Sequence, residues 1–350
     1  MAVNSIRIFY VRRIFHPIFA EIIAKRPQIT LDMIENDASD EAAAPILAGA
    51  HIYSVSSARD ELNPKFYVTS ELLTKTPALL LVSTTGAGFD TVKLKDCTAA
   101  GIAVVNQSGG NREAVAEHVL ALMISLSKRI GETDRVMRRD RRMDRNLYMG
   151  HDILGKSIGV IGLGNVGGRI AELARGLFAM RVLAYDPYLD AAAIAAKGAE
   201  KVGLDELLSS VDFVSVNCPL TDETRGMIGA PQYALMQKHA FFITTARGSI
   251  HDETALAAAL KEKRIAGAGL DVWAKEPPDT DHPLLAFDNV IASPHSAGVT
   301  AEARETMGRI AAEQILATLD GKRPPRLLNP EVWPHFCARF AETFGFRPES

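Results

Sequence analysis

The feature that most constrains this chain is a glycine-rich turn, GLGNVG, at residues 162–167. An apolar run ends in this turn, and an amphipathic segment, residues 165–178, follows with apolar side chains on one helical face. A strand, a glycine turn and a helix in this order are typical of a unit that binds a dinucleotide. Gly162 permits the tight turn, Gly164 lets the backbone approach a pyrophosphate, and Gly167 lets helix and strand pack closely. The start of the helix offers its free N–H groups to the phosphates.

An acidic residue stands where such a unit needs one. The short strand expected at Arg181–Tyr185 ends just before Asp186, 19 residues beyond Gly167. A carboxylate at the end of this strand hydrogen-bonds the ribose diol and repels a 2′-phosphate. Pro187 and Tyr188 follow Asp186, with no arginine to bind such a phosphate. The sequence therefore predicts NAD rather than NADP as the cofactor.

Apolar strands alternate with helices through most of the chain. This alternation favours parallel sheets that are covered on both faces. We expect two doubly wound α/β domains, a smaller one in the first hundred residues and a larger one around the glycine turn. The expected strands are Ile6–Tyr10, Ile29–Ile34, His51–Ser54, Leu79–Ser83 and Ala103–Asn106, followed by 158–163, 181–185, 211–217, 240–245, 266–270 and 289–292.

Composition narrows the class of protein. At roughly 150 residues per domain, 350 residues predict about two domains. The formal net charge of −3 argues against a surface that binds nucleic acid. Three cysteines are too few for a disulfide framework or a zinc cluster, which points to a reducing compartment, the cytoplasm, and to no metal. We find no uncharged apolar stretch of about 18 residues, so we expect no membrane span.

Three further polar residues follow expected strands of the larger domain. Arg247 lies in TTARGS, Glu276 in GLDVWAKEPP and His295 in IASPHSAG. The carboxyl ends of parallel strands form the edge where doubly wound sheets bind ligands. Arginine binds a carboxylate through two parallel hydrogen bonds, and histidine is the general acid or base suited to neutral pH. A neighbouring carboxylate stabilises the protonated imidazole, so the three residues suit hydride transfer to the ketone of an anionic substrate.

With these residues, the chain resembles the D-isomer-specific 2-hydroxyacid dehydrogenase family, to which D-3-phosphoglycerate dehydrogenase and the hydroxypyruvate and glyoxylate reductases belong. The resemblance runs from about Pro77 to Pro325 and includes LVSTTGAGFDTVKL, GIAVVN, NREAVAEH, GKSIGVIGLGNVG, CPLTDETRGMI, TTARGSIHDE, GLDVWAKEPP and NVIASPHSAGVT. It implies two Rossmann-like domains and an NAD-dependent enzyme. The expected reaction interconverts a small 2-oxo acid and its D-2-hydroxy acid, with hydroxypyruvate, glyoxylate or 3-phosphoglycerate as the favoured substrates.

The resemblance also implies roles for single residues. Arg247 would orient the substrate, His295 would protonate the carbonyl oxygen, and Glu276 would pair with that imidazole. The substrate carboxylate would meet the loop Thr85, Gly86, Ala87 and Gly88, for which a plain turn is the alternative. The cofactor would contact Asn165 and Val166 at the pyrophosphate, Asp186 at the ribose, Asp271 at the nicotinamide amide, and also Thr224, Thr245, Ala246 and Arg247.

In the family's arrangement, the cofactor domain is inserted into the substrate domain. We therefore expect a substrate domain at 1–106 and 300–330, an NAD-binding domain at 107–299, and a C-terminal tail at 331–350. The cleft between such domains closes to exclude water. Family members are typically dimers joined through the nucleotide domain, so we expect a homodimer.

Some interpretations stay open. The arginine-rich segment 135–145 is either a phosphate or nucleic-acid patch, or a solvated helix face or subunit contact with charge pairs. Arg59 either reaches a substrate phosphate or carboxylate, or lies at the surface. The family usually has a valine where this chain has His251 and an apolar residue where it has Ser296. The alternative function is an NAD(H)-sensing interaction protein, because some relatives serve as corepressors on the same fold.

Overall fold

The chain folds into two compact units in a computed structural model that describes residues 5–140 and 142–349. The first unit holds the described residues up to Asn111 and from Thr300 onward. The second unit is Arg112–Val299, and it is inserted into the sequence of the first. Each unit has its own parallel sheet, so two doubly wound α/β domains are confirmed.

The borders of the units differ from the expected ones at two places. Residues 107–111 belong to the first unit, whereas we expected them in the nucleotide domain. Residues 331–349 also belong to the first unit, whereas we expected a separate tail. Residues 1–4 and 350 of the expected ranges lie outside the described residues.

Five parallel strands form the sheet of the first unit, in the order β2-β1-β3-β4-β5. They are β1 (Ile6–Val11), β2 (Ile29–Ile34), β3 (Ile52–Ser56), β4 (Leu81–Thr85) and β5 (Ala103–Val105). Successive side chains of a strand point to opposite faces of its sheet. Ile8 of β1 accordingly packs into the core on one face and Phe9 into the core on the other. Both faces are apolar and need covering.

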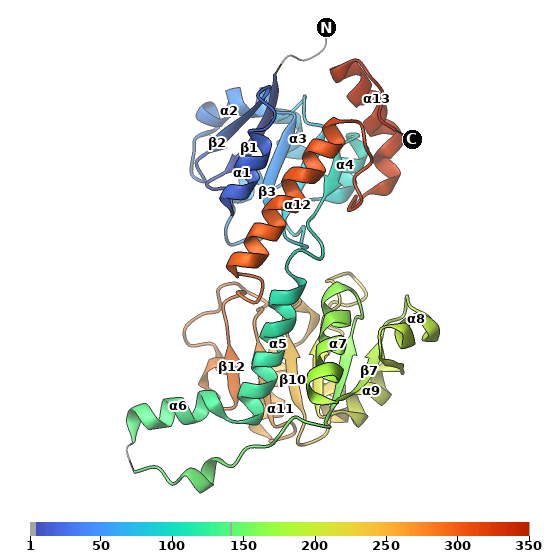
Figure 1. Ribbon diagram of the computed structural model, residues 1–350. Helices are drawn as coiled ribbons and strands as arrows, with labels where there is room; N and C mark the ends of the chain where they lie inside the picture. Colours follow the sequence, from blue (N-terminus) through green and yellow to red (C-terminus); the bar gives the residue numbers. More distant parts are fainter. Residues whose placement is uncertain (1–4, 141, 350) are drawn as a thin grey trace. The chain divides into compact units, whose positions relative to one another are not determined.

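Helices cover both faces of this sheet (Figure 1). Those on the Ile8 face are α1 (Pro17–Ile23), α12 (Ala301–Leu319) and α13 (Trp333–Phe344), and those on the Phe9 face are α2 (Asp40–Gly49), α3 (Ser70–Lys75) and α4 (Leu94–Ala99). Ser39 and Thr300 cap α2 and α12, since each hydroxyl accepts a hydrogen bond from the third N–H of its helix. The single-turn helices η1 (Pro64–Phe66) and η5 (Pro330–Val332) complete the unit.

The segment expected as a tail is a structural part of the first unit. Trp333, Phe336 and Phe340 of α13 are buried in the core on the Ile8 face. Just before this helix, the side chain of Asn329 accepts a hydrogen bond from the Val104 N–H at 2.9 Å and donates to the Ile102 carbonyl at 3.0 Å. The aromatic spacing indicated packing, but the partner is a sheet far away in sequence.

The second unit is a seven-stranded parallel sheet in the order β12-β11-β10-β9-β6-β7-β8. Its strands are β6 (Ser157–Ile161), β7 (Arg181–Tyr185), β8 (Glu200–Lys201), β9 (Phe213–Val216), β10 (Phe241–Thr244), β11 (Gly267–Leu270) and β12 (Val290–Ala292). The direction in which strands are added reverses between β6 and β9. In open α/β sheets the ligand crevice lies at such a reversal, outside the carboxyl ends of the strands.

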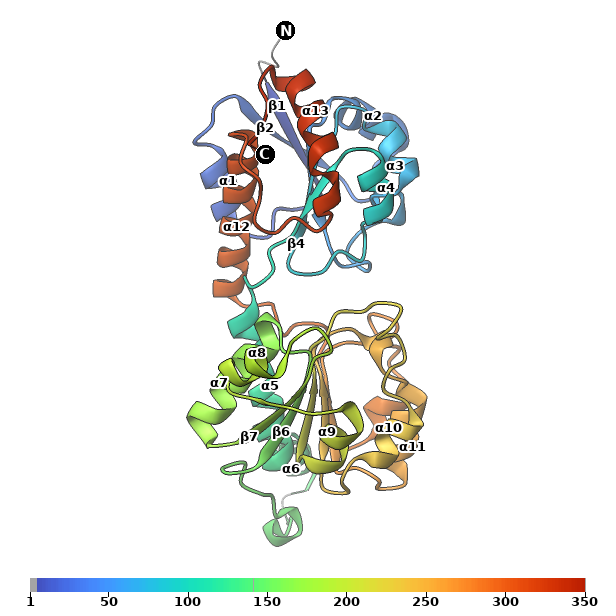
Figure 2. The same cartoon turned by 90° about the vertical axis from the view of Figure 1, so that its right-hand side faces the viewer.

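Helices also cover both faces of the larger sheet (Figure 2). One face carries α5 (Arg112–Ser127), α7 (Asn165–Phe178) and α8 (Ala191–Ala196), and the other carries α9 (Leu204–Ser210), α10 (Ala230–Leu235) and α11 (Glu253–Lys261). α11 begins where the Asp252 carboxylate accepts hydrogen bonds from the N–H groups of Thr254 and Ala255.

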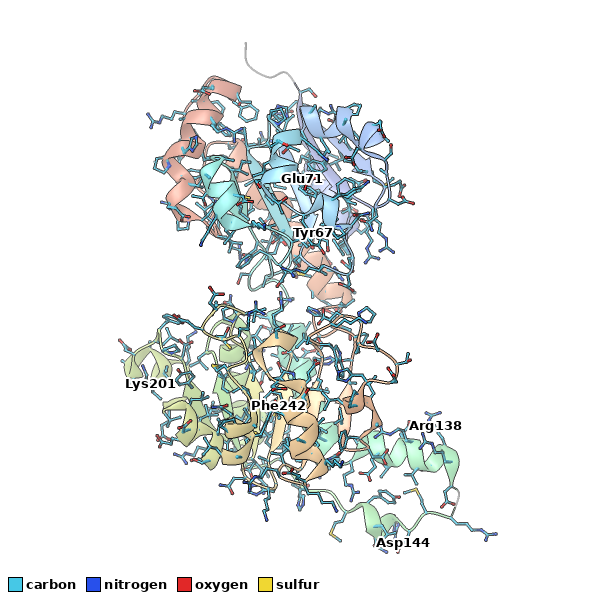
Figure 3. The ribbon with its side chains drawn as sticks, turned by 180° about the vertical axis from the view of Figure 1, so that it is seen from behind. Tyr67, Glu71, Arg138, Asp144, Lys201 and Phe242 are labelled. Carbon is cyan, nitrogen blue, oxygen red and sulfur yellow. The ribbon has the colours of Figure 1, made fainter. Side chains whose placement is uncertain are left out.

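The arginine-rich segment 135–145 begins within α6 (Ile130–Arg139) and ends at the first residue of the single turn η2 (Arg145–Tyr148), and Figure 3 labels Arg138 and Asp144 of this segment. Arg138 pairs with Asp134 at 2.9 Å and Arg135 with Asp288 at 3.5 Å. Arg141 lies outside the described residues. α6 buries none of its residues, so it is an exposed helix face with charge pairs. In the part of the chain that the structure describes, we find no helix long and apolar enough to cross a membrane.

His251 is a buried polar residue of the second unit. It follows the single turn η3 (Gly248–Ile250), and only 4% of its surface is exposed. Its Nδ1 lies 3.1 Å from the Tyr233 hydroxyl, and its Nε2 has no hydrogen-bond partner among the residues that the structure describes. Burial lowers the pKa of His251 to about 4. The imidazole is therefore neutral in the folded chain at neutral pH.

His251 should make the stability of the chain depend on pH. An unfolded histidine titrates near 6.5, so the unfolded chain binds the proton first as the pH falls. We expect the free energy of unfolding to fall by about 3 kcal/mol between pH 6.5 and 4 through this group. Urea unfolding at a series of pH values measures it.

Two variants isolate this contribution. His251→Val should flatten the loss of stability between pH 6.5 and 4. His151→Val, at an exposed position, should keep the wild-type dependence. Equal slopes for His251→Val and the wild type would contradict a neutral buried imidazole.

Candidate active site

The three glycines of GLGNVG meet different surroundings. Gly162 has a φ of +88°, and a Cβ there would lie 2.7 Å from the amide nitrogen of Cys218. A Cβ at Gly167 would lie 2.1 Å from the carbonyl oxygen of Gly162. At Gly164, in contrast, a Cβ would meet nothing within 4 Å. The turn thus excludes side chains at its packed positions and leaves open space at Gly164, where a ligand can approach the backbone.

The helix that follows offers N–H groups to an anion. α7 begins after Gly164, which has no side chain to cap it. No hydrogen bond among the described residues uses the N–H groups of Val166 or Gly167. First-turn N–H groups and the helix dipole favour a bound phosphate. The turn and the helix start therefore fit a dinucleotide pyrophosphate.

Asp186 directly follows β7 and lies against the glycine turn. Its Oδ2 accepts a hydrogen bond from the Leu163 N–H, and its Oδ1 accepts one from the Tyr188 N–H, both at 3.0 Å. These contacts hold the carboxylate next to the turn. A ribose bound beside the glycines would meet this acid, as the spacing in the sequence predicts.

Thr245, Ala246 and Arg247 directly follow β10 and are half-buried. Nη1 of Arg247 donates a hydrogen bond to the Ala246 carbonyl oxygen at 2.7 Å. Thr224 lies after β9 on a loop, and its hydroxyl donates to the Pro219 carbonyl oxygen at 2.7 Å. All four residues follow strands that lie beside one another in the sheet.

His295 and Glu276 form a hydrogen-bonded pair. Nδ1 of His295 lies 2.8 Å from Oε2 of Glu276, and Oε1 of Glu276 accepts a hydrogen bond from the Trp273 N–H at 3.0 Å. Because Nδ1 faces a carboxylate, it carries a proton, and Nε2 is the ring atom left for a substrate. The His295 side chain keeps a relative exposure of 35%, so a small molecule can reach it.

The pair shifts the pKa of both of its members. Burial on its own would lower the pKa of His295, but the hydrogen bond and the negative charge of Glu276 outweigh it and raise the pKa above 6.5. Burial would raise the pKa of Glu276, and contact with His295 lowers it instead. The arrangement favours a protonated imidazole beside an ionised carboxylate. Such a histidine can donate a proton near neutral pH.

Asp271 holds the segment that carries His295. Its carboxylate is fully buried and accepts hydrogen bonds from the Ser296 N–H at 2.8 Å and the Ala297 N–H at 2.9 Å. The Asp271 carbonyl oxygen accepts one from the His295 N–H at 2.7 Å. His295 itself has a left-handed backbone with a φ of +53°, which costs free energy for a residue other than glycine. The contacts to Asp271 hold it in that conformation.

Two residues of this network were not singled out from the sequence. The Ser293 hydroxyl donates a hydrogen bond to Oδ1 of Asp271 at 2.7 Å. Nε2 of His118, from α5, lies 3.0 Å from the same hydroxyl. Ser293 stands two residues before His295 and directly after a strand, which is a signal that could have been used. His118 lies far from it in sequence and shows no comparable signal.

The loop Thr85–Gly88 follows β4 in the first unit. Gly86 has a φ of +86° and makes two hydrogen bonds with Gln107. The Gly86 N–H donates to Oε1 of the Gln107 side chain at 2.6 Å, and the Gly86 carbonyl oxygen accepts from the Gln107 N–H at 2.8 Å. The Asn106 side chain donates to the Ala87 carbonyl oxygen at 2.8 Å. Within the described chain, no hydrogen bond uses the N–H groups of Ala87 or Gly88. Asn106 and Gln107, which the sequence analysis missed, shape a loop with two N–H groups to offer.

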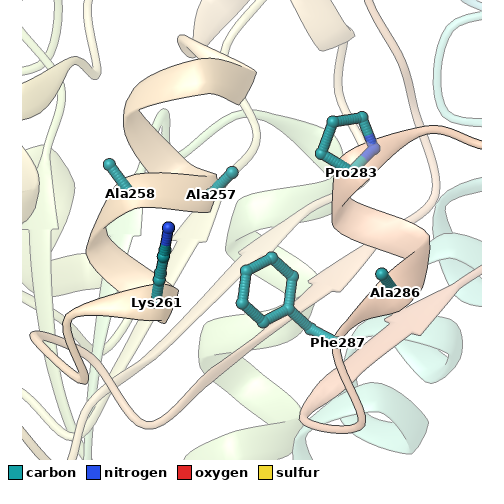
Figure 4. A pocket seen from close by; sticks show the side chains of 6 residues that line it. All are labelled: Ala257, Ala258, Lys261, Pro283, Ala286 and Phe287. Carbon is teal, nitrogen blue, oxygen red and sulfur yellow. The ribbon is translucent and has the colours of Figure 1, made fainter.

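The second unit also has two hollows. One, of about 570 Å³, lies along α7 and includes Gly164 and Asn165 at the N-terminus of that helix. The other, of about 350 Å³, lies between α11 and the single turn η4 (Pro283–Ala286) and is shown in Figure 4. Its lining is mostly apolar and consists of Ala257, Ala258, Lys261, Pro283, Ala286 and Phe287. It contains none of the predicted site residues. No group of three potential metal ligands occurs among the described residues.

Comparisons with known proteins agree on one family. The family model described as "D-isomer specific 2-hydroxyacid dehydrogenase, NAD binding domain" matches residues 120–297. A glyoxylate reductase of Korarchaeum cryptofilum is 38% identical over 268 residues, which are 76% of this chain and 80% of that protein. A D-3-phosphoglycerate dehydrogenase of Archaeoglobus fulgidus is 40% identical over 268 residues, but the match spans only 50% of its length.

Solved structures show the same fold. A D-lactate dehydrogenase of Aquifex aeolicus, complexed with NAD and lactic acid, has a TM-score of 0.77 at 28% identity and covers 90% of this chain and 96% of its own. An acyclic imino acid reductase complexed with NADPH and D-Arg has a TM-score of 0.80 at 27% identity, with 92% of this chain and all of that chain covered. Proteins similar to this chain thus bind either nicotinamide cofactor.

Asp186 should decide between the two cofactors. Asp186→Asn keeps an oxygen for one of the two backbone N–H groups and removes the negative charge that repels a 2′-phosphate. We expect NADPH to bind about tenfold or more tighter to this variant than to the wild type, and NADH to bind more weakly. Fluorescence titration of both cofactors measures the dissociation constants. A ratio of NADH to NADPH affinity that stays at the wild-type value would show that Asp186 does not contact the ribose.

Proposed function

The chain belongs to the D-isomer-specific 2-hydroxyacid dehydrogenase family, and on that premise we propose that it interconverts a small 2-oxo acid and its D-2-hydroxy acid with His295 as general acid and base. The enzyme class and the NAD cofactor follow from the family. The substrate and the residue roles are our proposal. Hydroxypyruvate, glyoxylate and a 3-phosphoglycerate-like acid are the candidate substrates.

One observation carries the proposal. Nδ1 of His295 lies 2.8 Å from a carboxylate oxygen of Glu276, at the same sheet edge as the glycine turn. A histidine with a paired carboxylate, a raised pKa and a ring nitrogen that a small molecule can reach is suited to proton transfer at neutral pH. A dinucleotide turn without such a pair would support cofactor binding alone.

The residues of the second unit fit the NAD cofactor. Gly164 and the first N–H groups of α7 would hold the pyrophosphate, and Asp186 the ribose. Thr224, Thr245, Ala246 and Asp271 are proposed as further contacts, at the strand ends that follow the turn. When bound, NADH would supply the hydride that adds to the carbonyl carbon, and NAD⁺ would accept it in the reverse direction.

Three side chains would act on the substrate. Arg247 would orient its carboxylate through a two-point hydrogen bond. In reduction, the protonated Nε2 of His295 donates its proton to the carbonyl oxygen, and the imidazole becomes neutral. Throughout, Glu276 keeps the Nδ1 proton and the orientation of the ring. In oxidation, the neutral Nε2 takes the hydroxyl proton, and Glu276 stabilises the imidazolium that results.

In the first unit, we propose that the loop Thr85–Gly88 binds the substrate carboxylate. The N–H groups of Ala87 and Gly88 are available, and successive N–H groups of a turn suit an anion. Asn106 and Gln107 hold the loop in shape through its carbonyl oxygens and the Gly86 N–H.

We further propose a homodimer in the cytoplasm. Met137 of α6, Leu147 of η2 and Met149 directly after η2 are exposed at 66%, 70% and 75%, which suits a contact with a second copy. The three cysteines are free thiols, as expected in a reducing compartment. No nucleic acid is proposed as a partner, because arginines of α6 pair with acidic side chains.

His295→Ala tests the proposed chemistry. Loss of a general acid lowers the rate of reduction by about two to four orders of magnitude. Binding of NADH should change by about twofold or less, because the cofactor contacts lie elsewhere. The measurement is NADH oxidation with glyoxylate, hydroxypyruvate, pyruvate, phenylpyruvate and phosphohydroxypyruvate, with the handedness of the product determined for each acid that reacts.

A matched control is His239→Ala. This exposed histidine lies 3.1 Å from Asp212, away from the strand ends that carry the site, and its loss should leave turnover unchanged. Normal turnover by His295→Ala would show that the proton donor is another group. An L-2-hydroxy acid product, or no reaction of the wild type with any of these acids, would overturn the proposed function.

A further inference from the structure

A group of side chains surrounds the carboxyl end of the sheet in the first unit. We call it the Arg304 cluster, and it consists of Arg13, Phe15, Ser56, Glu61, Arg304 and Met307. Its members come from the segment after β1, the end of β3 and the loop that follows it, and the first turns of α12. The catalytic proposal above uses none of them.

Charges within the cluster are only partly balanced. Nη2 of Arg13 lies 2.8 Å from Oε1 of Glu61, and the Ser56 hydroxyl donates to the other carboxylate oxygen at 2.9 Å. Glu61 is thus occupied by two partners. The guanidinium carbons of Arg13 and Arg304 lie 5.1 Å and 4.6 Å from the centre of the Phe15 ring. Both cations therefore flank one aromatic side chain, and only Arg13 has a carboxylate partner.

Arg304 is the unbalanced member. It is half-buried, and within the described residues its guanidinium makes no hydrogen bond and no ion pair. Burial lowers the pKa of Arg304; the charge of Glu61 opposes this shift and that of Arg13 adds to it. Taking a cation out of water costs free energy unless an anion or hydrogen-bond acceptor replaces the water. The position is suited to an anion that the chain itself does not supply.

The cluster adjoins the loop proposed to bind the substrate carboxylate. Met307 lies three residues after Arg304 on α12, so both lie on one side of the helix. A Cβ built at Gly86 would lie 3.8 Å from Sδ of Met307 and 3.9 Å from Oγ of Ser57. The Ser57 hydroxyl in turn donates to the Thr85 carbonyl oxygen. Met307 and Ser57 therefore lie next to the loop, and Arg304 stands one turn before Met307 on the same side of α12.

We propose that Arg304 binds a second anionic group of the substrate, a carboxylate or a phosphate on the side chain of the 2-oxo acid. The inference rests on the proposed function and narrows its substrate class. A guanidinium fits either anion through two parallel hydrogen bonds. Arg59, the candidate from the sequence, lies on the same edge, but it is exposed and its Nε donates to the Asp90 carbonyl oxygen. Acids without a second charge, such as glyoxylate and pyruvate, are poorer substrates under this proposal.

The test compares 2-oxo acids that share a carbon skeleton and differ in whether they carry the second anionic group. One pair is phosphohydroxypyruvate and hydroxypyruvate, and the other is 2-oxoglutarate and 2-oxopentanoate. The wild type should prefer the charged member of at least one pair by about tenfold or more in kcat/KM. Whichever pair shows the larger preference identifies the anion as phosphate or carboxylate.

Arg304→Gln should lower kcat/KM for the charged acid by about 10- to 100-fold and change the uncharged one by less than about threefold. Arg304→Lys, which keeps the charge but loses the planar fork, should retain an intermediate preference. If circular dichroism shows that Arg304→Gln does not fold, the Arg304→Lys variant alone is used for the comparison. The control is Arg309→Gln on the same helix, where the arginine is exposed and pairs with Glu305 at 2.8 Å. This variant should keep the wild-type preference.

Different failures separate the inference from the proposed function. Equal loss of kcat/KM for both members of each pair, or a wild type without preference, overturns the role of Arg304 and leaves the dehydrogenase function intact. A wild type that reduces no acid overturns the function instead. In that case, calorimetric titration of the NADH-bound protein with the same acids decides the inference. The inference is supported if the wild type binds the charged acid and Arg304→Gln binds it more weakly. It is overturned if both proteins bind the acid equally well, or if the wild type does not bind it.

Discussion

The site depends on the buried carboxylate of Asp271. It accepts hydrogen bonds from the N–H groups of Ser296 and Ala297, the two residues that follow His295. These bonds hold His295 in a left-handed backbone conformation, which is unfavourable for a residue with a side chain. In that conformation Nδ1 reaches Glu276 at 2.8 Å. The same carboxylate accepts a hydrogen bond from the Ser293 hydroxyl, and His118 of α5 contacts that hydroxyl through Nε2. A fully buried acid thus links the helix α5, the end of β12 and the proposed proton donor, His295.

The chain combines two kinds of electrostatic arrangement at the ends of its strands. Around the glycine turn, backbone N–H groups and an open glycine suit a pyrophosphate, and the acid Asp186 lies beside them. Around His295, burial and a carboxylate oppose each other, and the carboxylate prevails. We propose that the first arrangement binds the cofactor, and the second favours the protonated form of His295. Both arise because parallel strands end at the same edge of the sheet.

Much of this could be predicted from the sequence, where the signal is local. The helix 165–178 and the strands 181–185 and 29–34 lie where the apolar pattern placed them. The helix buries one apolar face on the sheet, and the strands place apolar side chains in the cores on both sides of their sheets. The fold class, the family and the NAD cofactor are confirmed. Glu276 and His295 stand 19 residues apart and were paired by resemblance to the family; the structure places them in contact.

What the sequence could not predict depends on contacts between distant segments. The aromatic residues of α13 pack on strands near the start of the chain, so the segment is a helix rather than a tail. Gln107 holds Gly86, and Arg304 lies against Phe15. In each of these cases, the sequence around a residue does not show which distant residue it contacts. Periodicity shows that a residue is buried, but not which element buries it.

The most direct test of the account is the pH dependence of kcat/KM for reduction in the wild type and in Glu276→Gln. If Glu276 holds the proton on His295, the pH at which the rate declines should fall in the variant, so that its deficit is largest at neutral and alkaline pH and shrinks as the pH is lowered. An unchanged midpoint of the decline, with a rate lowered equally at every pH, would contradict the claim that Glu276 sets the protonation of the proton donor.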